Sequence, residues 1–126
     1  MKKIFLSALL LLCVSAFAQK QYTLQSPDGK ISITVEAGEQ LTYAVTHGKT
    51  CVLAPSAIGM TLTDGTQLGQ KPVVRNAKTR SVNQSVKTQL YKRAEIPETY
   101  NELTLTLKGN YKVIFRAYDE GVAYRF

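Results

Sequence analysis

The side chains that could carry acid–base chemistry in this sequence are its nine carboxylates. Cleavage of a glycosidic bond needs two carboxyl groups that face each other across that bond. Six of the nine have turn-like neighbours or flank a glycine: Asp28, Asp64, Asp119, Glu120, Glu36 and Glu39. The other three gather around Pro97 and form the one local acidic candidate: Glu95, Glu98 and Glu102. Charged residues in polar surroundings are typical of a solvated loop, so we interpret this group as part of a loop.

Nucleophilic catalysis has one candidate pair, Cys51 and His47, the only histidine. Val52 and Leu53 follow the cysteine and predict a buried, unreactive thiol. His47 lies in His47-Gly48-Lys49, which has the composition of a hairpin turn, and a third group that would orient it is not evident. One cysteine and one histidine cannot build a tetrahedral zinc site, and a single cysteine past the first 18 residues cannot form an internal disulfide.

Apolar residues alternate with polar ones through most of the chain, which puts one face of each strand on a core. The apolar positions are Ile31, Ile33, Val35, Leu41, Tyr43, Val45, Leu103, Leu105, Leu107, Tyr111, Val113, Phe115, Val122, Tyr124 and Phe126. They are the β-branched and aromatic types that suit a pleated surface, together with leucine. The pattern predicts an all-β, antiparallel β-sandwich.

Turn signals separate these runs at intervals typical of a sandwich or barrel. They are Ser26-Pro27-Asp28-Gly29, Ala37-Gly38-Glu39, His47-Gly48, Asp64-Gly65, Lys108-Gly109-Asn110 and Asp119-Glu120-Gly121. Glycine supplies a positive φ there, and Asp or Asn tolerates it. We expect about eight or nine strands, with a loop near Glu95 to Thr99 because Pro97 should break a strand.

The first 18 residues have the three parts of a secretory signal peptide. Lys2 and Lys3 form a basic start, Ile4 to Val14 is almost wholly apolar, and Ala16-Phe17-Ala18 is an A-x-A cleavage site. The apolar run is shorter than the roughly 18 residues of a membrane anchor. We therefore expect cleavage after Ala18, a mature domain over 19–126, no membrane insertion afterwards, and a periplasmic or extracellular location.

The basic residues outside the leader do not form a nucleic-acid site. Without Lys2 and Lys3 the formal charge of +7 falls to about +5. Most of the central cations stand among Ser, Thr, Gln and Asn, and aromatic residues do not interleave with them: Arg75, Lys78, Arg80, Lys87, Lys92 and Arg93. This pattern indicates a solvated sheet face, and we expect no nucleic-acid partner.

Tyrosine is the residue type that leaves a sugar-binding role open. Seven tyrosines are present, and such rings stack on sugars and donate a hydrogen bond at their tip. Tyr43, Tyr111 and Tyr124, however, stand on the apolar side of their strands, which favours a place in the core.

Two stretches resemble the start of glycoside hydrolase family 97. The first, residues 24–65, carries "SPDG", "LTY" and "PSAIG" followed by "DG". The second, residues 100–126, begins with "YNEL" and ends with "FRAYDEGVAYRF". The order and spacing of these elements, and the leader before them, are similar to those of the family.

The resemblance implies an N-terminal β-super-sandwich that packs on a catalytic (β/α)₈ barrel and a small closing β-domain. It implies hydrolysis of α-linked glucosides or galactosides, with either inversion or retention, and a calcium ion in the full-length enzyme. The acid, the base or nucleophile, and a calcium ligand from the N-terminal domain would all lie beyond Phe126. No catalytic, cofactor-binding or metal-binding residue is therefore assigned within this chain, and no cofactor is expected to bind it.

We expect the chain to be a non-catalytic portion of an exported α-glycoside hydrolase, cut inside the sandwich and so incomplete at its C-terminus. Its partners would be the catalytic barrel and, in the full-length protein, an α-linked oligosaccharide. A stand-alone carbohydrate-binding domain and a structural β-domain are the alternatives. Because a sandwich that lacks strands has open edges, we also expect the chain alone to be marginally stable or to self-associate.

Overall fold

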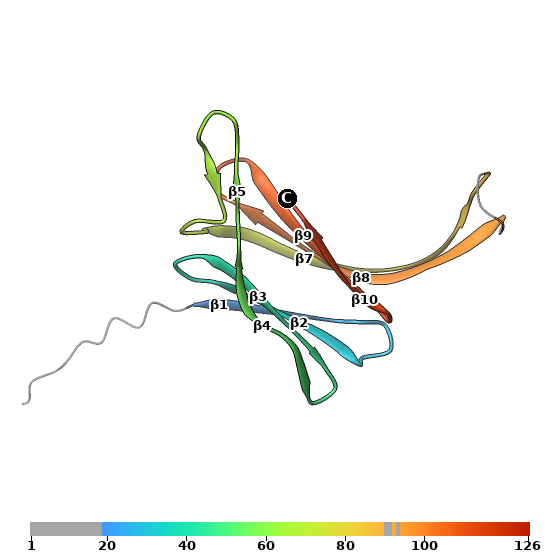
Figure 1. Cartoon of the computed structure of the whole chain (residues 1–126). Helices are drawn as coiled ribbons and strands as arrows, with labels where there is room; N and C mark the ends of the chain where they lie inside the picture. Colours follow the sequence, from blue (N-terminus) through green and yellow to red (C-terminus); the bar gives the residue numbers. More distant parts are fainter. Residues whose placement is uncertain (1–18, 90–91, 93) are drawn as a thin grey trace, which may run out of the picture.

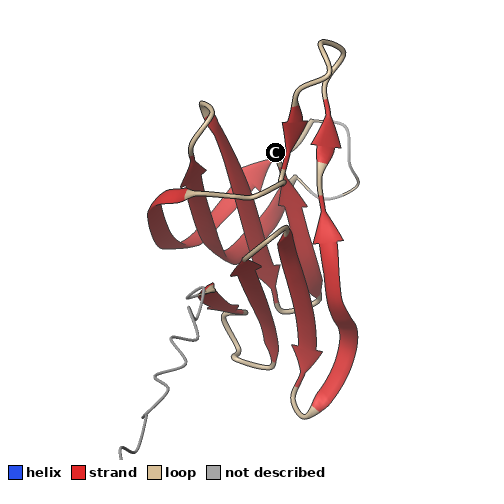
Figure 2. Cartoon of the chain, turned by 90° about the vertical axis from the view of Figure 1, so that its left-hand side faces the viewer, coloured by secondary structure: helices blue, strands red, loops and turns tan. Residues whose placement is uncertain are grey.

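The computed structural model describes residues 19–89, 92 and 94–126, and this part of the chain folds into antiparallel strands and turns (Figures 1 and 2). The leader predicted for residues 1–18 lies outside the described residues. No helix in the described part is long and apolar enough to span a membrane. The all-β prediction is confirmed.

The first sheet has the order β1-β2-β3-β4, and every neighbouring pair is antiparallel. Its strands are β1 (Lys20–Gln25), β2 (Ile31–Ala37), β3 (Leu41–His47) and β4 (Thr50–Ile58). Ile31, Ile33 and Val35 are buried while the residues between them are not, as the period of two predicts.

The second sheet has the order β10-β9-β8-β7. Its strands are β7 (Val74–Lys87), β8 (Glu95–Leu107), β9 (Tyr111–Tyr118) and β10 (Gly121–Arg125), and a separate two-stranded pair joins β5 (Met60–Thr61) to β6 (Gln67–Leu68). The described residues therefore form ten strands rather than the predicted eight or nine. The turn predicted at Asp64-Gly65 lies between the two short strands, which the sequence pattern did not predict as strands.

The core lies between the two four-stranded sheets (Figure 1). Leu103, Leu105 and Leu107 of β8 lie opposite Phe115, Val113 and Tyr111 of β9, and these side chains pack toward residues of the first sheet. Tyr43 and Tyr111 pack against this core, as predicted. Tyr124 contacts the rings of Tyr43 and Phe115, with centroids 5.3 and 6.0 Å away, although 42% of it is exposed.

The prediction of a loop near Glu95 to Thr99 is wrong, because these residues belong to β8. They pair with β7 from Val82 opposite Tyr100 to Lys87 opposite Glu95, and Pro97 lies opposite Ser85. The pairing of β8 with β9 starts only at Asn101, so residues 95–100 have a strand on one side alone. Proline is tolerated on such an edge, where a missing N–H breaks no ladder on the open side. This part of the hairpin, residues 82–87 with 95–100, extends beyond the sandwich and curls (Figure 1), and we call it the arm.

Candidate functional site

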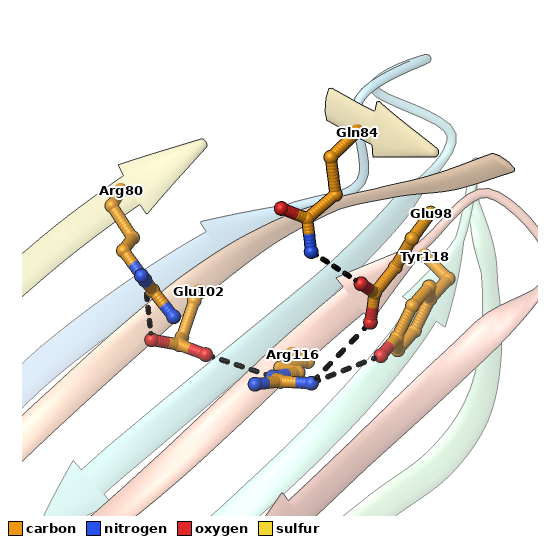
Figure 3. A network of polar contacts seen from close by, with 6 residues as sticks. All are labelled: Arg80, Gln84, Glu98, Glu102, Arg116 and Tyr118. Carbon is orange, nitrogen blue, oxygen red and sulfur yellow. Dashed lines mark hydrogen bonds and ion pairs between the residues drawn. The ribbon is translucent and has the colours of Figure 1, made fainter. Parts of the chain in front are cut away.

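The outer face of the second sheet, opposite the core, carries a row of three charged side chains at the base of the arm. The strand register places Arg80 of β7, Glu102 of β8 and Arg116 of β9 directly opposite one another. Arg80 Nε donates to Glu102 Oε1 at 2.7 Å, and Arg116 Nε donates to Glu102 Oε2 at 2.8 Å (Figure 3). We call Arg80, Glu102 and Arg116 the three-strand brace, because their contacts tie β7 and β9 to β8.

Further polar contacts extend from Arg116 of the brace to Glu98 and Gln84 of the arm. Arg116 Nη1 lies 3.9 Å from Glu98 Oε1 and donates to the Tyr118 hydroxyl at 3.5 Å (Figure 3). Gln84 Nε2 donates to Glu98 Oε2 at 2.7 Å across the β7–β8 pair. Glu98 therefore links the arm to the Arg116 guanidinium group.

Tyr100 forms the apolar part of this site. It is 3% exposed although it does not belong to the core cluster. The Arg116 guanidinium carbon lies 4.3 Å from the centre of its ring, and the Tyr118 ring lies 5.2 Å away. A guanidinium over an aromatic face is attracted by the negative charge of that face, so Tyr100 helps to hold Arg116 in place.

The charges of the brace stabilise one another. The Arg80 hydrogen bond lowers the pKa of Glu102, and the Arg116 bond lowers it further, while burial acts in the opposite direction and is outweighed. The hydrogen bonds to Tyr118 and Glu102 raise the pKa of Arg116. A carboxylate whose two oxygens each accept from a guanidinium is a poor proton acceptor at neutral pH, so Glu102 is suited to holding strands together rather than to general base catalysis.

The structure thus overturns the solvated-loop interpretation of Glu95, Glu98 and Glu102. Glu98 and Glu102 both contact Arg116, and Glu102 is buried. Glu95 does not join them, because it lies near the tip of the arm and accepts a 3.4 Å hydrogen bond from Ser85 Oγ. The burial of Glu102 is possible because both of its oxygens have charged partners.

The prediction that Cys51 is buried is also wrong, because its thiol is exposed. Cys51 lies on β4, at the edge of the first sheet, and pairs with Thr46, whereas His47 pairs with Thr50. The register of this pair shifts between Tyr43 and Thr46. Val52, next to the cysteine, is 64% exposed, so apolar neighbours in the sequence do not place this segment in the core.

Other predicted surface positions agree with the structure. Asp28, Asp64, Asp119 and Glu120 lie in turns, and Asp64 Oδ1 accepts from the Thr66 N–H at 2.9 Å. The central cations predicted to be solvated are exposed, apart from Arg93, which lies outside the described residues: Arg75, Lys78, Arg80, Lys87 and Lys92. Arg80 is exposed and still belongs to the brace.

The two family-like stretches meet at one end of the sandwich. The backbone N–H of Asp28, in the "SPDG" turn, donates to Asp119 Oδ1 of the "DEG" turn at 2.9 Å. Asp28 Oδ1 accepts from Ser26 Oγ at 2.6 Å and from the Lys30 N–H at 3.0 Å, and the Ser26 bond is the main cause of its lowered pKa. Nearby, Asn101 Nδ2 donates to the Gln25 carbonyl at 2.8 Å. These contacts join the two sheets.

A metal site in the described residues would be a cluster of side chains that could hold the ion. In residues 19–89, 92 and 94–126, no three or more His, Cys, Asp or Glu side chains gather as a metal site would require. The calcium ion expected for the full-length enzyme stays a prediction.

Sequence reasoning missed the partners of Glu102, although the signal for one of them was present. The predicted turn at Lys108-Gly109-Asn110 pairs Leu107 with Tyr111. Counting back along both strands from that pair places Glu102 opposite Arg116. The length of β7 and the place of Arg80 on it had no comparable signal, because the chain between β7 and β8 carries no short turn motif.

Comparison with known proteins agrees with this fold. Residues 24–126 match the family described as glycosyl-hydrolase 97 N-terminal. The whole chain is 42% identical, over 127 residues, to a retaining alpha-galactosidase of Bacteroides thetaiotaomicron, of which it covers 19%.

Solved structures show the same architecture in larger proteins. A glycoside hydrolase family 97 enzyme of Pseudoalteromonas sp. strain K8, in complex with panose, superposes with a TM-score of 0.73 at 25% identity over 82% of this chain and 17% of that one. A beta-arabinopyranosidase shares the fold, with a TM-score of 0.71 at 22% identity over 83% of this chain and 18% of that one. The chain spans about a fifth of the length of these relatives. It belongs to the glycosyl-hydrolase 97 N-terminal family.

Proposed function

We propose that this chain is the non-catalytic, N-terminal sandwich portion of an exported α-glycoside hydrolase, where it packs on the catalytic barrel and helps to shape the sugar site. The observation that carries the proposal is the 42% identity, along the whole chain, to a segment that makes up 19% of a retaining alpha-galactosidase. That relative makes an α-linked galactoside the first substrate class to test.

The charges of the described residues support a structural role. Glycoside cleavage needs a carboxyl pair with space for substrate between the two groups. Glu98 and Glu102 instead share the Arg116 guanidinium, and Glu102 has no free oxygen. The reaction and the calcium ion would then depend on residues of the longer enzyme, and no step of that reaction is assigned to this chain.

The chain alone provides a direct test. We expect no turnover of p-nitrophenyl α-galactoside or α-glucoside, and no saturable heat of binding with α-linked oligosaccharides in titration calorimetry. Turnover would contradict a non-catalytic role. Saturable binding by the isolated chain would favour the alternative of a stand-alone carbohydrate-binding domain.

A further inference from the structure

Gln19 is the first residue that the structure describes, and it lies just outside the first sheet. It is exposed, and β1 begins with the next residue, Lys20, which pairs with Ala37. The Gln19 carboxamide lies against Gly38, because a Cβ on that glycine would be 2.7 Å from Gln19 Nε2. Beside them is a groove of about 420 Å³ that Gln19, Glu36 and Gly38 help to line, so the Gln19 side chain has room to turn.

Export would give Gln19 a free α-amine. This inference therefore rests on the proposed function, of which export is a part. Cleavage after Ala18 releases the backbone nitrogen of Gln19 as a primary amine. Only Cα, Cβ and Cγ separate that nitrogen from Cδ of the same residue, so the two atoms can close into a small lactam ring. Such an intramolecular attack is favoured because the reacting groups are already held close together.

We propose that Gln19 of the exported chain is converted to pyroglutamate. The α-nitrogen attacks Cδ, so the bond between these two atoms forms and the bond from Cδ to Nε2 breaks. A proton passes from the α-nitrogen to Nε2, which leaves as ammonia. The reaction needs neither an oxidant nor a reductant, and it removes the positive charge of the N-terminus because a lactam nitrogen is not basic.

The fold accepts this modification at residue 19. Ring closure draws the side chain of Gln19 back toward its own nitrogen and disturbs no pair of the β1–β2 ladder, which starts at Lys20. The carboxamide leaves its place against Gly38, which is exposed to the groove rather than part of the core. The ring therefore costs neither a strand pair nor a core contact.

A lactam at this position would protect the start of β1. Aminopeptidases act on a free α-amine, and pyroglutamate has none. Removal of Lys20 and Gln21 would delete the first two pairs of the β1–β2 ladder, on a strand whose Leu24 belongs to the core. The modification thus keeps the pairing of β1 complete after export.

The intact mass of the exported chain tests the proposal. The original chain and Gln19→Asn are expressed with their leaders in a bacterial host, purified, and held at neutral pH before mass spectrometry of the undigested proteins. The original should have the mass of residues 19–126 less one ammonia. Gln19→Asn is the matched control, because it keeps a carboxamide but is one methylene too short to close the same ring. It should retain the full mass of its residues 19–126.

A general aminopeptidase gives a second readout, and circular dichroism confirms that both chains are folded. The enzyme should leave the original unchanged and should remove at least residue 19 from Gln19→Asn, since this residue lies outside the ladder. Loss of ammonia in the original alone, together with its resistance, supports the proposal.

Three results would overturn it. An original chain that begins at Gln19 and keeps its full mass rules out pyroglutamate while the proposed export stands. A chain that retains Met1 overturns the export and this inference together. Equal loss of ammonia from the original and from Gln19→Asn places the reaction at another residue.

Discussion

Replacing Glu102 by glutamine removes the charge at the centre of the brace while keeping its shape. Glu102 has a side chain only 6% exposed, and it accepts from Arg80 and Arg116, whose side chains are 56% and 27% exposed. A hydrogen bond to a charged group contributes about 1.5–3 kcal/mol. Because water reaches both arginines, we take the lower part of that range and expect Glu102→Gln to cost about 2 kcal/mol of unfolding free energy.

The assay is thermal and urea unfolding of the purified chain, followed by circular dichroism. For a domain of this size a loss of about 2 kcal/mol lowers Tm by roughly 10 °C. Glu120→Gln, which removes an exposed carboxylate from the β9–β10 turn, is the matched control and should shift Tm little. Arg80→Gln should cost less than Glu102→Gln, because Arg80 is exposed. If Glu102→Gln and Glu120→Gln were equally stable, the brace would not hold the strands together.

Three further predictions follow from single positions. The pKa of Glu102 is lowered in the folded chain. Its contribution to the free energy of unfolding is therefore complete above its unfolded pKa of about 4.3 and is lost as the pH falls through the folded value. In urea unfolding, the stabilities of the original chain and of Glu102→Gln should converge below about pH 4, and a difference that stays constant would refute this. Gly69 has φ +88, and a Cβ there would lie 2.4 Å from the Ile58 carbonyl oxygen. Gly69→Ala should therefore lower the free energy of unfolding by about 3 kcal/mol or more in the same assay. Gly48 has φ +58 but open space around it, so Gly48→Ala should lower it by only about 1 kcal/mol. Mass spectrometry of the chain exported by a bacterial host should find Gln19 as its first residue, and a chain that retains Met1 would contradict cleavage after Ala18.

Much of the fold was predictable because the physical rules involved are local. Alternation along β2, β3, β8 and β9 identified the buried face of each strand, and the turn predicted at Asp119-Glu120-Gly121 joins β9 to β10. Successive side chains of a strand point to opposite faces, so the positions of the apolar residues determine which face is buried. These rules need no knowledge of the rest of the chain.

The errors arose where a distant strand decides the outcome. Pro97 lies within β8 because no strand pairs with its other side, and Cys51 is exposed because β4 is an edge with a shifted register. Glu102 is buried because two arginines from different strands reach it. The sequence around a residue does not show how far the neighbouring strands extend or which of their side chains reach it. The burial and pairing of these three residues could therefore not be predicted from local composition.

The measurement that tests the central claim most directly is the activity of a chimera. This chain would replace the matched segment of the retaining alpha-galactosidase of Bacteroides thetaiotaomicron, with the enzyme lacking that segment as the control. We expect the chimera to fold and to hydrolyse p-nitrophenyl α-galactoside with a kcat/KM within about ten-fold of the parent, and the control to lose activity, since shape complementarity at a domain contact follows the shared fold. A folded control that retains full activity, or a folded chimera without activity, would contradict the assignment of this chain as a working part of such an enzyme.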